Sequence, residues 1–302
     1  MLGSRWIRAA AAAAALFAVS IAPLALAQDA QPEADEAGKA VWQAAGAAML
    51  HGPNTVQLRN QGQLALPAGY GFVPPKEGAA VMDMLGNQTD ERFLGLIFPE
   101  SEANWFVTMD YEPSGYIKDD DAKDWNADEL LQSLKDGTDA SNEHRREIGV
   151  SEIEVTRWVE RPAYDAATHR LVWSAEARDK SGKEPDPVVN YNTYVLGREG
   201  YVSLNLITSA STVEADKPAA HELLAAVSFN EGKRYSDFNA STDKVAAYGL
   251  AALVGGIAAK KLGLLAAIGV FVAKFAKVLI VGAAAAGAAI VKFLKGRNAS
   301  QA

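Results

Sequence analysis

Residues 188–208, with the sequence VVNYNTYVLGREGYVSLNLIT, give the clearest indication of the fold. Apolar and polar residues alternate on both sides of its central GREG segment, which is the pattern of two half-buried strands. Gly197 to Gly200 have the length and glycine content of a hairpin loop. The sequence therefore predicts antiparallel strands over 188–196 and 201–208.

Two further strands precede this hairpin, over 153–162 and 170–177, separated by the turn DAAT at 165–168. A helix over 217–227 and a short strand at Phe229 follow it. Consecutive strands joined by short turns are typical of an antiparallel sheet with segregated helices. We therefore expect an α+β domain with the helices on one face of the sheet.

The preceding half of the chain predicts the same kinds of element. We expect a helix over 40–50, a strand-like stretch over 56–66, a turn and a short edge strand over 67–75, strands over 92–98 and 104–111, and helices over 126–137 and 139–148. Gly137 and Gly149 are the predicted helix ends. Because 56–150 and 151–239 both place strands before a helix, an internal duplication is an alternative, although no motif repeats.

The first 27 residues have the three parts of a secretory signal peptide. Arg5 and Arg8 form a basic segment, residues 9–21 are apolar, and ALA at 25–27 offers a cleavage site between Ala27 and Gln28. The alternative is an uncleaved anchor, for which the apolar run is short. We expect a mature chain that begins at Gln28 with a flexible polar segment over 28–39.

Residues 245–302 form an Ala/Gly/Lys-rich segment without any acidic residue. Residues 262–293 exceed the roughly 20 residues that cross a bilayer. The positive-inside rule favours one C-terminal transmembrane helix over a hairpin that turns near 260–263. The predicted membrane-flanking basic residues are Lys260 and Lys261 outside, with Lys292, Lys295 and Arg297 in the cytoplasm. Residues 245–259 would lie along the membrane or pack on the body.

Charge and composition exclude several classes of function. Subtracting the two basic residues of the signal and the seven after Lys244 from the net charge of −8 leaves −17 for residues 28–244. An acidic body of this kind argues against nucleic-acid binding. The absence of cysteine excludes disulfide scaffolds and thiolate metal sites. No cofactor is predicted.

The loop KDDDAKDWN at 118–126 is the strongest candidate for a ligand or metal site. Its carboxylates, at Asp119, Asp120, Asp121 and Asp124, are ligands that suit Ca²⁺, although the EF-hand spacing is not met. The alternative is a solvated loop that caps the following helix. The four histidines show no paired metal-binding spacing.

Several segments resemble a bacterial family catalogued as domain of unknown function 2167. They are GYIKDDDA at 115–122, WNADELL at 125–131, THRLVWS at 168–174, VNYNTY at 189–194, LGREGY at 196–201 and GKRYSDFN at 232–239. The resemblance implies a membrane-anchored protein of unknown function and supplies no catalytic or binding residues. A fainter likeness of the 188–208 hairpin is to PsbP-like folds, an analogy of fold alone.

Three functions remain open. The first is a binding or scaffolding module in the periplasm, held at the bacterial inner membrane by a single span. The second is a hydrolase-like enzyme that uses the aspartate-rich loop or the polar region of Asn190, Asn192 and Arg198. The third is a membrane-active oligomer that assembles through the glycine-rich tail. The expected partners are membrane lipid, further copies of the chain or other envelope proteins, with no nucleic acid.

Overall fold

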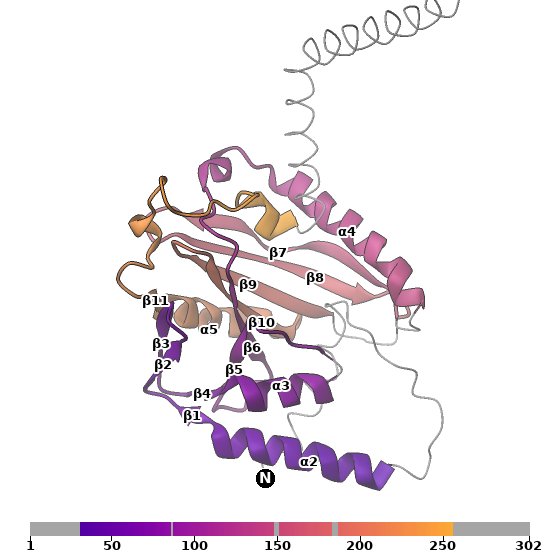
Figure 1. Cartoon of the computed structure of the whole chain (residues 1–302). Helices are drawn as coiled ribbons and strands as arrows, with labels where there is room; N and C mark the ends of the chain where they lie inside the picture. The colour runs from indigo at the N-terminus through magenta and orange to yellow at the C-terminus, as the bar shows by residue number, and fades with distance from the viewer. Residues whose placement is uncertain (1–30, 86, 148–150, 183–186, 256–302) are drawn as a thin grey trace, which may run out of the picture.

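The computed structural model describes residues 31–255, apart from 86, 148–150 and 183–186 (Figure 1). The predicted signal peptide with its Ala27–Gln28 site, the transmembrane helix, and Lys260, Lys261, Lys292, Lys295 and Arg297 all lie outside these residues. Within the described part of the chain, no helix has the length and hydropathy needed to cross a bilayer.

An eight-stranded antiparallel sheet forms the centre of the fold. Its strand order is β1-β4-β5-β6-β10-β9-β8-β7, and a second sheet has the order β11-β3-β2. The strands are β1 (Leu50–His51), β2 (Asn54–Leu58), β3 (Gly62–Leu66), β4 (Tyr70–Val73), β5 (Phe93–Pro99), β6 (Phe106–Glu112), β7 (Ile153–Asp165), β8 (Arg170–Asp179), β9 (Val188–Leu196), β10 (Tyr201–Ser209) and β11 (Val227–Phe229). The α+β prediction is confirmed.

The helices lie on both faces of the large sheet, so the prediction of helices on one face is wrong. They are α2 (Gln31–Ala48), α3 (Pro75–Met84), α4 (Ala127–Glu147) and α5 (Val213–Ala226). Figure 1 shows α5 on one side of β8 and β9, and α4 with the C-terminal segment, described over residues 244–255, on the other. The indole N–H of Trp158 on β7 donates to the carbonyl of Ala127 at the start of α4 over 3.0 Å.

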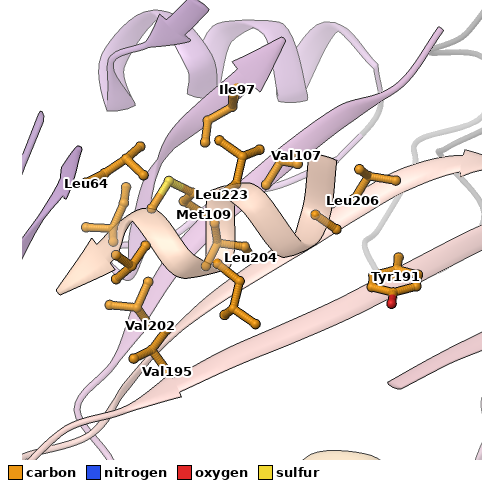
Figure 2. Packing of buried hydrophobic residues seen from close by; sticks show 14 of the residues in the cluster. Leu64, Ile97, Val107, Met109, Tyr191, Val195, Val202, Leu204, Leu206 and Leu223 are labelled. Carbon is orange, nitrogen blue, oxygen red and sulfur yellow. The ribbon is translucent and has the colours of Figure 1, made fainter. Parts of the chain in front are cut away.

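Both faces are covered because the strands bury apolar side chains on each of them. On one face, Leu204, Leu206 and Tyr191 pack with Leu223 of α5 and with the small sheet, and Figure 2 shows this cluster. On the other face, the neighbouring Leu196 packs with Leu250 of the C-terminal segment. When a strand is buried on both faces, neither face is uniformly polar. The alternation of apolar and polar residues in the sequence does not by itself reveal that both faces are covered.

Several local predictions also change. Helix α3 lies where no helix was predicted. It begins at Pro75, the last residue of the predicted turn and edge strand, because the missing N–H of a proline costs nothing at a helix start. Helix α4 continues through Gly137 without a break. Residues 31–39, expected to be flexible, belong to α2. The stretch over 56–66 is a hairpin of β2 and β3, and β4 lies between β1 and β5 instead of at an edge.

The described part of the C-terminal segment, residues 244–255, packs on the body. Val245 forms a parallel bridge with Tyr116. Leu250 and Val254 are fully buried and Leu253 nearly so. Residues 245–259 were expected either to lie along the membrane or to pack on the body. For residues 245–255, which the structure describes, it shows packing on the body.

Candidate functional site

Six polar side chains form a band across the middle of the large sheet. We call this band the polar strip. It consists of Thr108 and Asp110 on β6, Ser203 and Asn205 on β10, and Asn190 and Asn192 on β9. In the register of these strands, Asn205 is opposite both Thr108 and Asn192, and Ser203 is opposite Asp110. Side chains directly opposite one another lie about 4.5–5.5 Å apart, so the strip is continuous.

The alternation of the strands places the strip on the face that also carries α4 and the C-terminal segment. The residues between its members, such as Met109, Leu204 and Tyr191, point to the opposite face and are buried in the core with α5. The strip itself is half-buried. It separates the apolar cluster under α3, which includes Ile207, from the cluster under the C-terminal segment.

The amides of the strip satisfy only part of their hydrogen-bonding capacity. The side-chain N–H of Asn205 donates to the side-chain oxygen of Asn190 over 3.0 Å. The side-chain N–H of Asn192 donates to the backbone carbonyl of Asn190 over 3.2 Å. The side-chain oxygen of Asn205 is buried and has no hydrogen-bond partner among the described residues. An unsatisfied buried acceptor costs about 1–3 kcal/mol, and a native structure that contains one calls for an explanation.

Asp110 is the acidic member of the strip. Burial, and next the charge of Asp90, raise the pKa of its carboxyl from 3.8 to about 6, although the positive charge of Arg92 opposes the shift. Arg92 is itself engaged, since its guanidinium forms ion pairs with Asp90 and Glu112. A carboxyl with a raised pKa on a half-buried polar surface is a typical functional-site candidate.

Aromatic side chains border one end of the strip. Trp173 on β8 is opposite Asn192, and Tyr194 on β9 is opposite Ser203. The rings of Tyr194 and Tyr201 meet edge to face at 5.6 Å. The indole N–H of Trp173 donates to the carbonyl of Leu253 over 3.0 Å, so the C-terminal segment holds this aromatic border in place.

The four aspartates of the 118–126 loop point in different directions. The Asp119 carboxylate accepts a hydrogen bond from the hydroxyl of Tyr164 over 2.8 Å. Asp120 and Asp124 are exposed, at the start and just after the end of a short 3-10 helix (Asp120–Lys123). Asp121 accepts from the backbone N–H groups of residues 250 and 251. Among the described residues, no group of three acidic or histidine side chains has the geometry to hold a metal ion.

The helix that follows the loop is capped by Asn126, whose side-chain oxygen accepts from the backbone N–H of Asp128 over 2.9 Å. The carboxylates at 119–121 do not take this part. Instead Asp119 connects the loop to Tyr164 of β7, and Asp121 connects it to the C-terminal segment.

A second cluster surrounds Asp119. The hydroxyl of Tyr164 lies 3.1 Å from Nδ1 of His169, and the His169 ring stacks on Tyr235 with ring centres 4.1 Å apart. Burial lowers the pKa of His169, although the charge of Asp119 opposes this. His169 also has a positive φ of 53° in the β7–β8 turn. The cluster ties the acidic loop, the β7–β8 turn and the residues after β11 together.

Sequence reasoning found part of the polar strip. It identified Asn190 and Asn192 but grouped them with Arg198, which instead forms an ion pair with Asp243. It missed Thr108, Asp110, Ser203 and Asn205. The signal in the sequence was the polar residues at alternating positions of β6 and β10. The same pattern is typical of an ordinary solvent-exposed sheet face, so it did not single out a site.

The chain is therefore an α+β domain whose antiparallel sheet carries a polar array between two apolar clusters. The chain belongs to the family described as protein of unknown function (DUF2167), whose profile matches residues 51–285. The predicted family membership is confirmed. No curated protein matches the chain.

Two solved structures show weak similarity. The solution structure of the cyanobacterial PsbP protein of Synechocystis has 11% identity and a TM-score of 0.35, covering 60% of this chain and 91% of that one. The Ran-binding protein Mog1p of Saccharomyces cerevisiae has 12% identity and a TM-score of 0.31, covering 58% and 94%. Similarity at this level carries no argument about function.

Proposed function

We propose that the chain is a binding module that takes up its ligand on the polar strip. The observation that carries the proposal is the buried side-chain oxygen of Asn205, which has no hydrogen-bond partner among the described residues. Near it on the same strip lies the carboxyl of Asp110, whose pKa burial raises to about 6. A ligand that supplied the missing partners would be bound without first breaking internal hydrogen bonds. Binding of this kind does not require a catalytic residue near the strip.

The proposal includes the location of the module outside the bacterial cytoplasmic membrane, held by a single C-terminal span. The signal-like residues 1–27 and the acid-free apolar tail support this location. The contact of Asp121 with Leu250 connects the start of the tail to the body. Such a connection would hold the strip at a defined place relative to the anchor.

Cysteine labelling tests the location. The native chain has no cysteine, so a single introduced thiol has no background. We expect that a cysteine replacing Ser181 reacts with an impermeant thiol reagent in intact cells, whereas one replacing Ser300 reacts only after lysis. Labelling of both residues in intact cells would indicate a hairpin. Labelling of neither would contradict export.

Ligand-induced stabilisation tests the binding role. A ligand that binds only the folded state raises the melting temperature, and the rise follows its concentration. We expect that at least one class of small envelope molecule stabilises the purified protein, and that Asn192→Ala with Asn205→Ala abolishes the effect. The matched control is Asn54→Ala, an exposed asparagine on β2 of the small sheet. Stabilisation that survives the strip variants would place the ligand elsewhere.

A further inference from the structure

We infer that the polar strip binds an uncharged, hydroxyl-rich ligand, an oligosaccharide of a few neutral sugar rings that lies across the strands of the sheet. This inference rests on the proposed binding role of the strip and assigns its ligand class. It follows from the kinds of hydrogen-bonding group on the strip, their charge, their spacing and their aromatic border.

The groups of the strip match hydroxyl groups. Asparagine amides and the hydroxyls of serine and threonine each both donate and accept hydrogen bonds. Five of the six strip residues belong to these types. A sugar hydroxyl also donates and accepts, so neighbouring hydroxyls can engage an amide oxygen and an amide N–H together. The carboxyl of Asp110 adds an acceptor for two adjacent hydroxyls.

Charge argues against ionic ligands. The strip contains no lysine or arginine, and the nearby Arg92 is held by Asp90 and Glu112. The body around the strip carries a net charge of −17 over residues 28–244. An anionic ligand would be repelled, and a cationic one would find a single carboxylate among neutral amides. A neutral ligand incurs neither cost.

The aromatic border fits the apolar face of a sugar ring. The C–H groups of a sugar ring pack against the faces of tryptophan and tyrosine, while its hydroxyls form hydrogen bonds at the ring edge. Trp173 and Tyr194, both half-buried, lie directly next to the asparagines and serine of the strip. The bond from Trp173 to the carbonyl of Leu253 restricts the orientation of its indole.

The combined length of the strip and its aromatic border suggests an oligomer. From Thr108 on β6 the line of opposite residues passes through Asn205 and Asn192 to Trp173 on β8. It crosses three gaps between strands, which amounts to about 14 Å at 4.7–4.9 Å each. A single sugar ring would occupy only part of that length, whereas two or three linked rings would span it.

Calorimetric titration of the full chain tests the ligand class. The protein is kept in a detergent without a sugar head group, and the neutral probes are maltohexaose, cellohexaose and chitohexaose. Hexagalacturonate is the charged probe of equal length, and a six-residue Ser/Gly peptide is the amide probe. We expect saturable binding of at least one neutral probe and at least tenfold weaker binding of hexagalacturonate. Asn205→Ala and Asn192→Ala should each weaken the neutral probe at least tenfold, with Asn54→Ala unchanged.

Four results would overturn the inference. If no neutral probe binds, or if its affinity is the same in the strip variants that retain the native circular dichroism, the ligand class is wrong. If the peptide binds in a strip-dependent manner and the sugars do not, the binding role of the strip stands and only the saccharide assignment fails. If the sugars bind and only Asn54→Ala weakens them, both the assignment and the proposed site fail.

Discussion

The carboxylate of Asp121 caps the backbone at Leu250, 129 residues further along the chain. Its Oδ1 accepts from the N–H of Leu250 over 3.1 Å, and its Oδ2 accepts from the N–H of Ala251 over 3.0 Å. A helical turn starts at these residues, so the bonds satisfy two N–H groups that would otherwise lack an intrahelical partner. The acidic loop thereby acts as a cap for the C-terminal segment.

We expect that Asp121→Ala lowers the free energy of unfolding by about 1–2 kcal/mol, the usual cost of losing a cap. Asp121→Asn should cost less, because the amide retains one of the two acceptor oxygens. The neighbouring exposed Asp120→Ala is the matched control and should change stability by less than about 0.5 kcal/mol. Urea unfolding of the three variants measures this, and equal effects at 120 and 121 would contradict the capping role.

A double-mutant cycle with Gly249 tests the same contact independently. A Cβ at position 249 would overlap the carboxylate of Asp121, so Gly249→Ala must displace the cap. We expect Gly249→Ala to destabilise the native protein and to cost at least about 0.5 kcal/mol less when Asp121 is already alanine. Additive effects of the two changes would show that the glycine and the carboxylate act separately.

We expect Asp110→Asn to stabilise the protein at neutral pH. The pKa of Asp110 is about 6 in the folded protein and 3.8 ordinarily, so the folded state binds the proton more tightly. Stability is therefore lost as the pH rises from about 4 through 6. At 1.36 kcal/mol for each pKa unit, the variant should gain about 1–3 kcal/mol at pH 8.

The control for Asp110→Asn is the same measurement at pH 3.5, where Asp110 is protonated in the folded state and mostly protonated in the unfolded chain. There the two proteins should differ by less than about 0.5 kcal/mol. Urea unfolding at the two pH values gives the comparison. A gain of equal size at both values would mean that packing, and not ionisation, causes it.

His169 should give the opposite dependence on pH. Burial holds its pKa below the ordinary 6.5, so the unfolded chain binds the proton more tightly. This contribution to stability is complete above pH 6.5 and is lost as the pH falls through the folded pKa. We expect His169→Asn, which tolerates the positive φ, to flatten this loss.

The measurement for His169 is best made with Asp110→Asn as the parent, because the two groups act in neighbouring pH ranges with opposite sign. The slope of unfolding free energy against pH between 5 and 7 is then compared with and without His169→Asn. An unchanged slope would show that His169 does not couple folding to protons.

The stability of truncated chains should show where the folded body ends. A chain ending at Gly255 retains Leu250, Leu253 and Val254, whereas a chain ending at Asp243 loses all three buried side chains. At about 1.5–3 kcal/mol for each buried side chain, the shorter chain should be less stable by several kcal/mol. Equal denaturation midpoints for the two chains would show that residues 244–255 contribute nothing to the fold.

The strands of the second half were predictable because local signals agree there. The β9–β10 hairpin has alternating side chains and a glycine-bounded loop, and its observed ends match the expected ones within one residue. Helix α3 was missed because Pro74 and Pro75 indicate a turn as readily as a helix start. Gly137 suggested a helix end, but the continuous helix tolerates a single interior glycine at a cost of about 1 kcal/mol.

The candidate site was only partly predictable, since its residues come together through long-range pairing. Asn190 and Asn192 stand in one short motif, but Asp110 meets Ser203 only because β6 and β10 are neighbours in the sheet. Nothing local to either strand specifies that pairing. The same holds for Asp121 and Leu250, whose contact depends on the complete sheet.

The position of β10 between β6 and β9 has a consequence for fragments of this protein. The strands β1, β4, β5 and β6 come from the first half of the chain, and β7 to β10 come from the second. In the large sheet, the β6–β10 pairing is the seam where the two halves join, and the polar strip straddles it. A cut between β6 and β7 would leave Asp110 on one piece and Ser203 on the other. Neither piece alone would display the complete surface, so ligand recognition would require reassociation of the two.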